Sequence, residues 1–429
     1  MVDGAVLAYG VTFLVTPGRQ YLERTQAIPV EVVTPPGWTA VSTWPLADTF
    51  TSSVVDGSTV YAYVAADATQ LREAFLVTGP AVQTTRRSDG EELVEVAFGS
   101  AFGGDRDHFA DFVSAVTKQY ASRYGAPGPV HVYVSSGATT NQELTGIGRR
   151  NGFVVNVPAD DPLSESARLL VAHEALHLWN GHRLVPRPDA EIATRWFKEG
   201  VTHYLALKML ARTDTASENF VLGELARSAA SYARNPLSRG ATGSELDRAR
   251  FPYDFGFLVA HAADAALHAQ SGGRVSGEDW LAAMLARGDE PYDEQDLLVA
   301  LQSLAGGQEG VSAAERVWRR YVRVREPFDL AELFAQVGLH WLPETDESAG
   351  RLVPLARQLG RRPASNGCHE YPERQNPPPD LARRADREGD GPRYLPRRGL
   401  EPFRRQNHRS HRRTDPSFRQ WRLRPGCRS

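Results

Sequence analysis

Two patterns of apolar and polar positions divide the chain near residue 100. Before this point, Val- and Thr-rich stretches such as AIPVEVV and STVYAYVAAD alternate in places between apolar and polar residues, with turn sequences such as PPGW between them. This pattern predicts short β-strands. Beyond it, the apolar residues of DRDHFADFVSAVTKQYASRYG follow a helical spacing that ends at Gly125. We therefore predict an N-terminal β domain, a small sandwich or barrel, over residues 1–99.

The middle of the chain combines strands and helices. VHVYV and GFVVNV predict two strands, and a loop containing SSGATTNQELTG separates them. Asp161 and Pro162 suit the start of a helix that continues to about Gly181. Asp189 is the predicted cap of a further helix, which ends near Arg212.

After Arg212 the apolar spacing is almost entirely helical. The predicted helices span residues 215–235, 253–270, 276–287, 292–304, 312–323 and 329–338. Residues 346–429 show no apolar periodicity and are rich in Arg and Pro, so this segment cannot bury enough surface to offset its ordering entropy. We predict a disordered basic tail, and an out-of-frame reading of a GC-rich gene stays open as its origin.

Charge and cysteine content narrow the possible partners. The formal net charge is −3, and because the tail is strongly basic, the residues before it carry an acidic excess. We therefore expect no nucleic-acid partner. Both cysteines, Cys368 and Cys427, lie in the tail, so the body has no disulfide and no cysteine-ligated zinc.

Hydropathy bears on location. No apolar run reaches the roughly 18 residues that a membrane-spanning helix needs. The stretch GAVLAYGVTFLV follows Asp3 without a preceding Lys or Arg, which favours a first strand over a signal peptide. We expect a cytoplasmic protein, although the abrupt beginning leaves a missing upstream segment open. The oligomeric state is not indicated.

The stretch HEALHLWN carries the first candidate chemistry. His173 and His177 are four residues apart, so on a helix both imidazoles lie on one face and can bind one metal ion. Glu174 is placed to take a proton from a zinc-activated water. A hydrolytic zinc ion needs a third protein ligand, and Glu199 in the following helical stretch WFKEGVTHY can supply it. Short patterns of this kind also occur by chance.

These motifs resemble those of a known family. HEALHLWNGHRLVP followed by WFKEGVTHY is similar to the glycyl aminopeptidase family of gluzincin peptidases, metallopeptidase family 61, and the likeness extends over roughly residues 10–340. The resemblance implies one zinc ion bound by His173, His177 and Glu199, with Glu174 as general base. The implied fold is multidomain α+β. It comprises the N-terminal β domain (1–99), a thermolysin-like catalytic lobe (100–212), a helical lobe (213–345) and the tail (346–429).

FPYDFG contains a further candidate. It resembles the P-Y-x-x-G stretch of the related aminopeptidase N family, in which the Tyr donates a hydrogen bond to the oxyanion of the tetrahedral intermediate. Tyr253 occupies that position, and a phenol suits this task because it is neutral at pH 7. Packing of Tyr253 on the core is the alternative.

One segment departs from the family pattern. Aminopeptidases of this clan hold the free amine of the substrate with a Glu on the strand before the zinc helix, but here that segment reads GIGRRNGFVV. Arg149 and Arg150 either bind a carboxylate or are simply solvated. Aminopeptidase specificity therefore stays open, and the C-terminal PDZ domain of the family is not visible.

For the residues next to the motifs we predict positions, with a direct role in catalysis considered only for His203. We expect Trp179 in the core, Asn180 at the helix end and His182 beyond it. His203 either bonds a zinc ligand or assists proton transfer, or it is a half-buried helix residue. A solvated face is predicted for Arg195, Lys198 and Arg212.

The leading hypothesis is a zinc-dependent metallopeptidase that acts on peptide or protein substrates, with either end-trimming or internal specificity. The alternative is a catalytically impaired, zinc-stabilised peptide-binding protein on the same scaffold.

Overall fold

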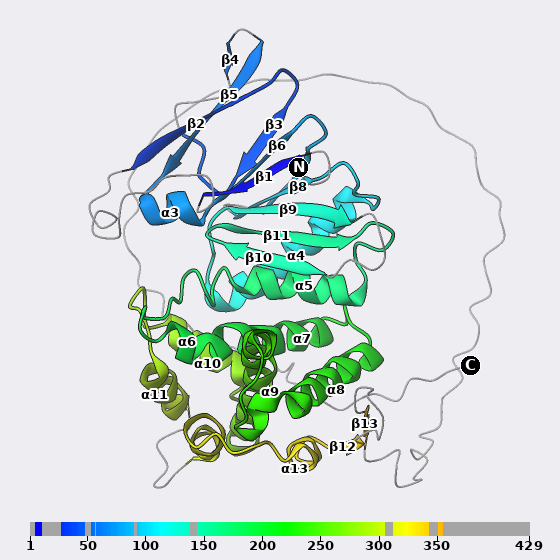
Figure 1. The fold of residues 1–429 in the computed structure, drawn as a ribbon, viewed down its shortest axis with the longest axis vertical. Helices are drawn as coiled ribbons and strands as arrows, with labels where there is room; N and C mark the ends of the chain where they lie inside the picture. The colour runs from blue at the N-terminus through cyan, green and yellow to red at the C-terminus, as the bar shows by residue number, and fades with distance from the viewer. Residues whose placement is uncertain are drawn as a thin grey trace, which may run out of the picture. The chain divides into compact units, whose positions relative to one another are not determined.

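The strands expected in the first part of the chain form two small antiparallel sheets and contribute to a larger one (Figure 1). The computed structural model describes residues 5–10, 27–47, 53–55, 57–89, 92–137, 144–304, 312–342 and 351–354. All of them belong to the unit Met1–Leu359, and the predicted tail lies outside the described residues.

The two small sheets each have three strands. One has the order β1 (Val6–Tyr9), β6 (Phe75–Gly79), β3 (Thr39–Ser42), and the other β2 (Ile28–Thr34), β5 (Ser58–Ala65), β4 (Ser53–Val55). The short helix α3 (Ala68–Glu73) links β5 to β6. In β2, half-buried and exposed residues alternate, as expected for a strand with one solvated face.

A five-stranded sheet carries the rest of the strand-rich part. Its order is β10 (Thr145–Arg149), β11 (Gly152–Pro158), β9 (Val130–Gly137), β8 (Glu92–Phe98), β7 (Gln83–Asp89). Because β8 pairs in parallel with β9, this sheet continues across the boundary predicted at residue 99. At the turn into β11, Asn151 adopts a φ of 64°, which Asn tolerates better than most residues. Strand β10 pairs with β11 and lies at the edge.

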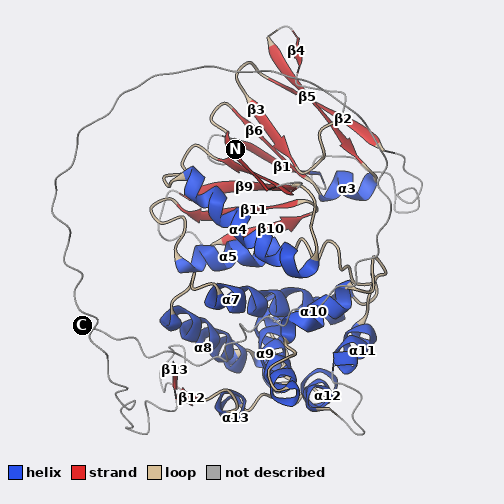
Figure 2. Cartoon of the chain, turned by 180° about the vertical axis from the view of Figure 1, so that it is seen from behind, coloured by secondary structure: helices blue, strands red, loops and turns tan. Residues whose placement is uncertain are grey.

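The two faces of this sheet have different neighbours. Val132 and Val155 face a core shared with the helices α4 (Arg106–Tyr124) and α5 (Glu165–Leu176). Tyr133 and Val154, each one residue away along its strand, pack instead with Phe75 of β6. Alternate side chains of a strand point to opposite faces, so helices cover one face and the sheet containing β6 covers the other (Figure 2).

Helix α5, which carries the first motif, is shorter than predicted. It begins at Glu165, because the side chain of Ser164 rather than Asp161 accepts a hydrogen bond from the backbone, here from the N–H of Ala167. It ends at Leu176, and His177 is its C-cap residue. The predicted continuation to Gly181 is therefore wrong, and the chain turns away directly after the second histidine.

The second motif lies on a helix that changes type. α6 (Glu191–Trp196) leads into a π-helical turn, η1 (Phe197–Val201), and then into α7 (Thr202–Arg212). The N-cap residue is Ala190, which makes no side-chain cap, so the cap predicted at Asp189 is wrong. A π turn inserts an extra residue and is frequently found at functional sites.

The predicted helical region follows α7. It contains α8 (Glu218–Arg234), η2 (Pro236–Arg239), α9 (Glu245–Ser271), α10 (Gly277–Leu285), α11 (Glu294–Leu304), α12 (Ala313–Val317), η3 (Trp318–Arg323) and α13 (Leu330–Ala335). A two-stranded sheet, β12 (Leu339–Leu342) and β13 (Arg351–Pro354), ends the described part. Helix α9 starts before the predicted position because Ser244 and Asp247 form a capping box.

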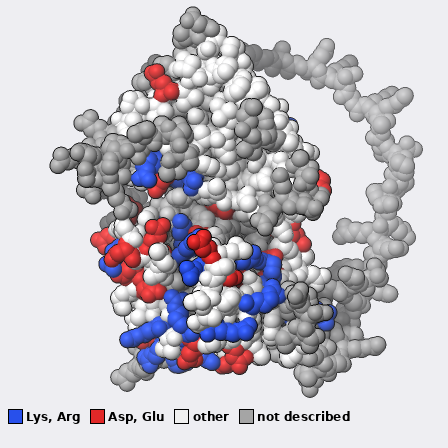
Figure 3. Space-filling model, in the orientation of Figure 1, with Lys and Arg blue, Asp and Glu red and all other residues white. Residues whose placement is uncertain are grey.

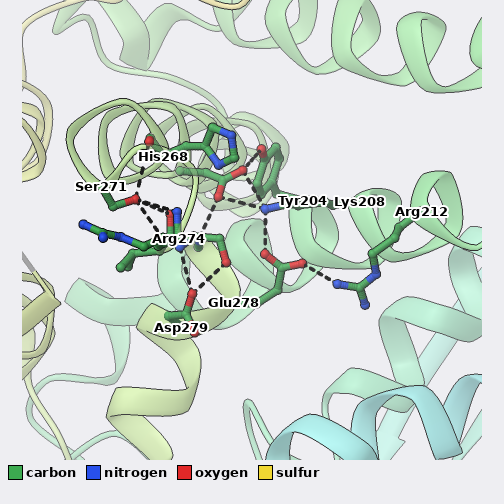
Figure 4. Close-up of polar contacts among 12 residues, drawn as sticks. Tyr204, Lys208, Arg212, His268, Ser271, Arg274, Glu278 and Asp279 are labelled. Carbon is green, nitrogen blue, oxygen red and sulfur yellow. Dashed lines mark hydrogen bonds and ion pairs between the residues drawn. The ribbon is translucent and has the colours of Figure 1, made fainter. Parts of the chain in front are cut away.

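A buried polar network connects three of these helices (Figure 4). Lys208 of α7 lies 2.8 Å from Asp264 of α9 and 2.6 Å from Glu278 of α10. Tyr204 donates a 2.7 Å hydrogen bond to Asp264, and Arg212 lies 3.1 Å from Glu278. Because each buried charge has an opposite partner, the network favours one arrangement of the three helices.

Charged side chains are unevenly distributed over the face shown in Figure 3. They gather on the helical part, whereas the strand-rich part is largely uncharged on this side. Within the described ranges, none of the helices combines the length and the apolar character that crossing a membrane requires.

Candidate metal centre

The three predicted metal ligands converge in the structure. The Nε2 atoms of His173 and His177 lie 3.0 Å apart, and a Glu199 carboxylate oxygen lies 3.7 Å from the first and 3.4 Å from the second. All three side chains are buried. Two imidazole nitrogens and one carboxylate oxygen around one point are the donor set that zinc accepts in a hydrolytic site. These residues therefore fit a single metal ion.

Burial and charge set the protonation of this cluster. Burial, reinforced by the neighbouring imidazoles, lowers the pKa of His173 to about 3, although Glu199 opposes the shift. Burial acts to raise the pKa of Glu199, but the two histidines overcome it and hold that pKa well below its usual range. A neutral imidazole and an ionised carboxylate are the forms that bind a metal ion.

The end of α5 orients the second histidine. Nδ1 of His177 lies 2.8 Å from the backbone oxygen of Asn180, so that nitrogen donates its proton there and leaves Nε2 facing the cluster. The Asn180 side chain donates to the backbone oxygen of Phe197 and to the hydroxyl of Thr202, at 3.1 and 3.0 Å. Asn180 thus fastens the end of α5 to the helix that carries Glu199.

Glu174 lies directly beneath the edge strand. A Cβ atom on Gly146 would lie 2.4 Å from Oε1 of Glu174, so glycine is required for this close approach. Burial raises the pKa of Glu174 to about 7, against the lowering effect of His177. Its Oε2 atom is buried and has no hydrogen-bond partner among the described residues. A carboxylate with this pKa can accept a proton near neutral pH.

Tyr253 reaches the cluster from α9. Its ring lies 6.2 Å from the ring of His173, centroid to centroid. Burial, together with the charge of Glu199, raises the pKa of Tyr253 above its ordinary value. The phenol therefore keeps its proton and can donate it in a hydrogen bond at the centre.

Trp179 and His203, which lie next to the motif residues in the sequence, contact residues outside the candidate ligand set. Trp179 is fully buried and donates a 2.9 Å hydrogen bond to the backbone oxygen of Gly125, as expected for a core residue. His203 lies 3.8 Å from Glu224 and 3.3 Å from Arg227. Its ring also contacts that of His173, but within the described part of the chain no hydrogen bond joins His203 to a predicted ligand.

The solvated face predicted on the second motif helix is present except at one residue. Arg195 and Arg212 are exposed, and Arg212 also pairs with Glu278. Lys198 is half-buried instead. A helical spacing of 3.6 residues does not anticipate the π turn at residues 197–201, so it places Lys198 wrongly. The sequence signal that could have placed Lys198 near the site is its position immediately before Glu199.

The candidate ligand set of two histidines and a glutamate is the donor set of the gluzincin type of zinc site. Within that class, residues 166–246 match the family model of the M61 glycyl aminopeptidases. This match spans both motif helices and confirms the resemblance predicted from the sequence. A search of curated proteins found no significant match.

One solved structure shows the same mixed arrangement of β-sheets followed by helices. An aminopeptidase N family protein from Idiomarina loihiensis superposes with a TM-score of 0.62 at 15% identity, covering 75% of this chain and 60% of that one. An M1 zinc metallopeptidase from Deinococcus radiodurans gives a TM-score of 0.49 at 17% identity, covering 71% and 65%. The chain thus spans less than two thirds of either structure, and the first likeness shows the fold alone.

Proposed function

We propose that this chain is a zinc-dependent peptidase, with Glu174 as general base and Tyr253 as oxyanion donor. The observation that carries the proposal is the convergence of His173, His177 and Glu199 beside a buried carboxylate that has a free oxygen within the described part of the chain. The helices α4 and α5 packed on the five-stranded sheet support a thermolysin-like lobe that comprises residues 100–212 together with the preceding strands β7 and β8.

The chain's own residues divide the work of hydrolysis. Zinc, when bound, lowers the pKa of a coordinated water to about 7 and polarises a carbonyl group. Glu174 accepts the proton of the attacking water and then passes it to the leaving amine. Tyr253 donates a hydrogen bond to the oxyanion that develops on the peptide carbonyl. Asn180 holds His177 in the tautomer that presents Nε2 to the metal.

The first test separates metal binding from turnover. Glu174→Gln should retain one zinc ion per chain and lose turnover by roughly 100-fold or more, because an amide cannot accept the proton. His173→Ala should lose the metal, because a ligand is missing. Elemental analysis and hydrolysis of a peptide library measure the two properties.

The matched control is His108→Ala, which changes an exposed histidine on α4 and should alter neither property. Full peptide hydrolysis by Glu174→Gln would contradict the proposed base. Zinc-loaded protein that binds peptides but cleaves none would favour the alternative of a catalytically impaired binding protein.

A further inference from the structure

The surroundings of Glu174 contain basic groups from two separate elements. Lys198, on η1, is half-buried, and its ammonium group makes no ion pair or hydrogen bond with any described residue. Its Cε would lie 3.1 Å from a Cβ atom placed on Gly181. The same Cβ position lies 3.3 Å from Nδ1 of His177. Lys198 is therefore a half-buried basic residue beside the histidine that ends α5, one helical turn after the candidate base.

Arg149 approaches the same region from the end of β10. It donates a 3.1 Å hydrogen bond to the backbone oxygen of Gly148, and its guanidinium lies 4.6 Å above the ring of Tyr9. Its Nε atom is buried without a partner within the described ranges. A Cβ atom on Gly148, the residue before Arg149, would lie 3.3 Å from Nε2 of His182 and 3.5 Å from Oε2 of Glu174, so Arg149 follows directly on the strand residue that covers the candidate base.

The acidic groups nearby do not neutralise these cations through close contacts. Asp67 lies 3.9 Å from Arg150. Glu73, at the end of α3, has a pKa that burial raises, and no ion pair joins it to Lys198 or Arg149 among the described residues. A half-buried ammonium group without a carboxylate partner loses hydration without compensation. A carboxylate of a bound ligand would compensate for the lost hydration by forming a charge-assisted hydrogen bond with the ammonium group.

We propose that Lys198, assisted by Arg149, binds a carboxylate of the substrate, so that peptides with an acidic group next to the scissile bond are preferred. This inference rests on the proposed peptidase function. A free N-terminal amine would meet like charge here, and the described residues of β10 include no acidic side chain to hold it. The carboxylate belongs either to an Asp or Glu side chain or to a C-terminus.

The test uses zinc-loaded full-length protein and matched peptides. Peptides differing only in Glu, Gln or Lys beside the scissile bond are compared with free and acetylated N-termini, and with C-terminal acid and amide ends. We expect kcat/KM to be at least about ten-fold higher for Glu than for Gln, lowest for Lys, and not reduced by acetylation. A preference restricted to C-terminal acids over amides identifies the terminal carboxylate as the source.

Variants of Lys198 then test whether its positive charge causes the preference for Glu peptides. Lys198→Met should bring the ratio of kcat/KM for Glu and Gln peptides close to one, Lys198→Arg should retain the preference, and Lys198→Glu should favour Lys peptides. Lys118→Met, which changes an exposed residue of α4, should leave the ratio unchanged. Higher salt should reduce the preference, because exposed parts of the site are screened.

The outcomes separate this inference from the proposed function. Equal cleavage of Glu and Gln peptides, or a requirement for a free amine, overturns the inference and leaves the peptidase function intact. If no peptide is cleaved, the peptidase proposal fails. Binding of the same Glu and Gln peptides to Glu174→Gln protein, measured by fluorescence anisotropy, then still decides whether the carboxylate site exists.

Discussion

At the scale of single residues, Tyr253 connects two parts of the candidate chemistry. Its ring lies beside that of His173, and the charge of Glu199 helps to raise the pKa of its phenol. The oxygen of a bound peptide carbonyl gains negative charge as the tetrahedral intermediate forms, so it becomes a stronger hydrogen-bond acceptor than it is in the substrate. The hydroxyl is therefore placed for an interaction that strengthens in the transition state.

Tyr253→Phe should lower kcat by roughly 100-fold while zinc content stays unchanged, because one oxyanion donor is lost. Steady-state kinetics and elemental analysis test this. Tyr61→Phe is the matched control, since it removes a hydroxyl that donates to the backbone oxygen of Trp38 in the N-terminal part. Equal kinetics for Tyr253→Phe and the native protein would assign Tyr253 to core packing.

The site residues that the sequence could predict are those whose chemistry and spacing are local. His173, Glu174 and His177 follow from one helical turn, and Glu199 follows from the need for a third ligand. Lys198 could not be placed in this way, because its orientation depends on the π turn. The hydrogen bond from His177 to Asn180 also escapes a sequence pattern, because the acceptor is a backbone oxygen.

At the scale of elements, two glycines set the distance between the helical segment α6–η1, which carries Glu199, and α9. A Cβ atom on Gly256 would lie 2.0 Å from the backbone oxygen of Trp196, and one on Gly200 would lie 2.5 Å from Gly256. The two backbones therefore touch between Glu199 and Tyr253. This crossing positions one predicted ligand relative to the predicted oxyanion donor.

Gly256→Ala should destabilise the protein by about 1–3 kcal/mol, because the helices must separate. It should also weaken zinc binding, since Glu199 moves with η1. Urea unfolding and zinc titration measure these effects. Gly223→Ala is the control, because its Cβ would meet nothing within 4 Å, and it should be neutral or stabilising. Unchanged stability and zinc affinity for Gly256→Ala would show that the crossing adjusts freely.

The sequence predicts whether an element is a helix or a strand better than it predicts the residues at which the element begins and ends. The strands β9 and β11 and the helix α4 follow from their own apolar patterns, which the local sequence contains. The ends of α5 and α9 depend on whether Ser164 and Ser244 act as caps. Several residues can cap at each end, and only the folded geometry selects one of them.

At the scale of the whole molecule, the predicted ligands join the strand-rich and helical parts. Helix α5 packs on the five-stranded sheet and on α7 (Figure 1), so it brings two histidines to the carboxylate of the adjoining η1. A metal ion bound there connects residues from both parts. Metal binding should therefore stabilise the fold as a whole.

Zinc at about 100 times its dissociation constant should stabilise the native protein by about 2.7 kcal/mol. Thermal unfolding with zinc and with a chelator measures the shift in Tm. His173→Ala should show no such shift. A native protein whose Tm does not respond to either addition would contradict a metal site at this junction.

The order of β-sheets before helices was predictable, because it follows from the change in apolar spacing. The strand pairing across residue 99 was not, since β8 and β9 are separated by α4 and their contact is non-local. The tail prediction lies outside the described residues, and the cytoplasmic location stays a prediction.

The glycines of β10 also bear on how the specificity of this scaffold can evolve. A side chain on Gly146 would start 2.4 Å from Glu174, and one on Gly148 would start 3.1 Å from the Cβ of His177. A mutation that introduced an acidic residue at either position would disturb the candidate catalytic groups before it could hold an amine. An acidic amine anchor on this strand would therefore require compensating changes around Glu174 and His177.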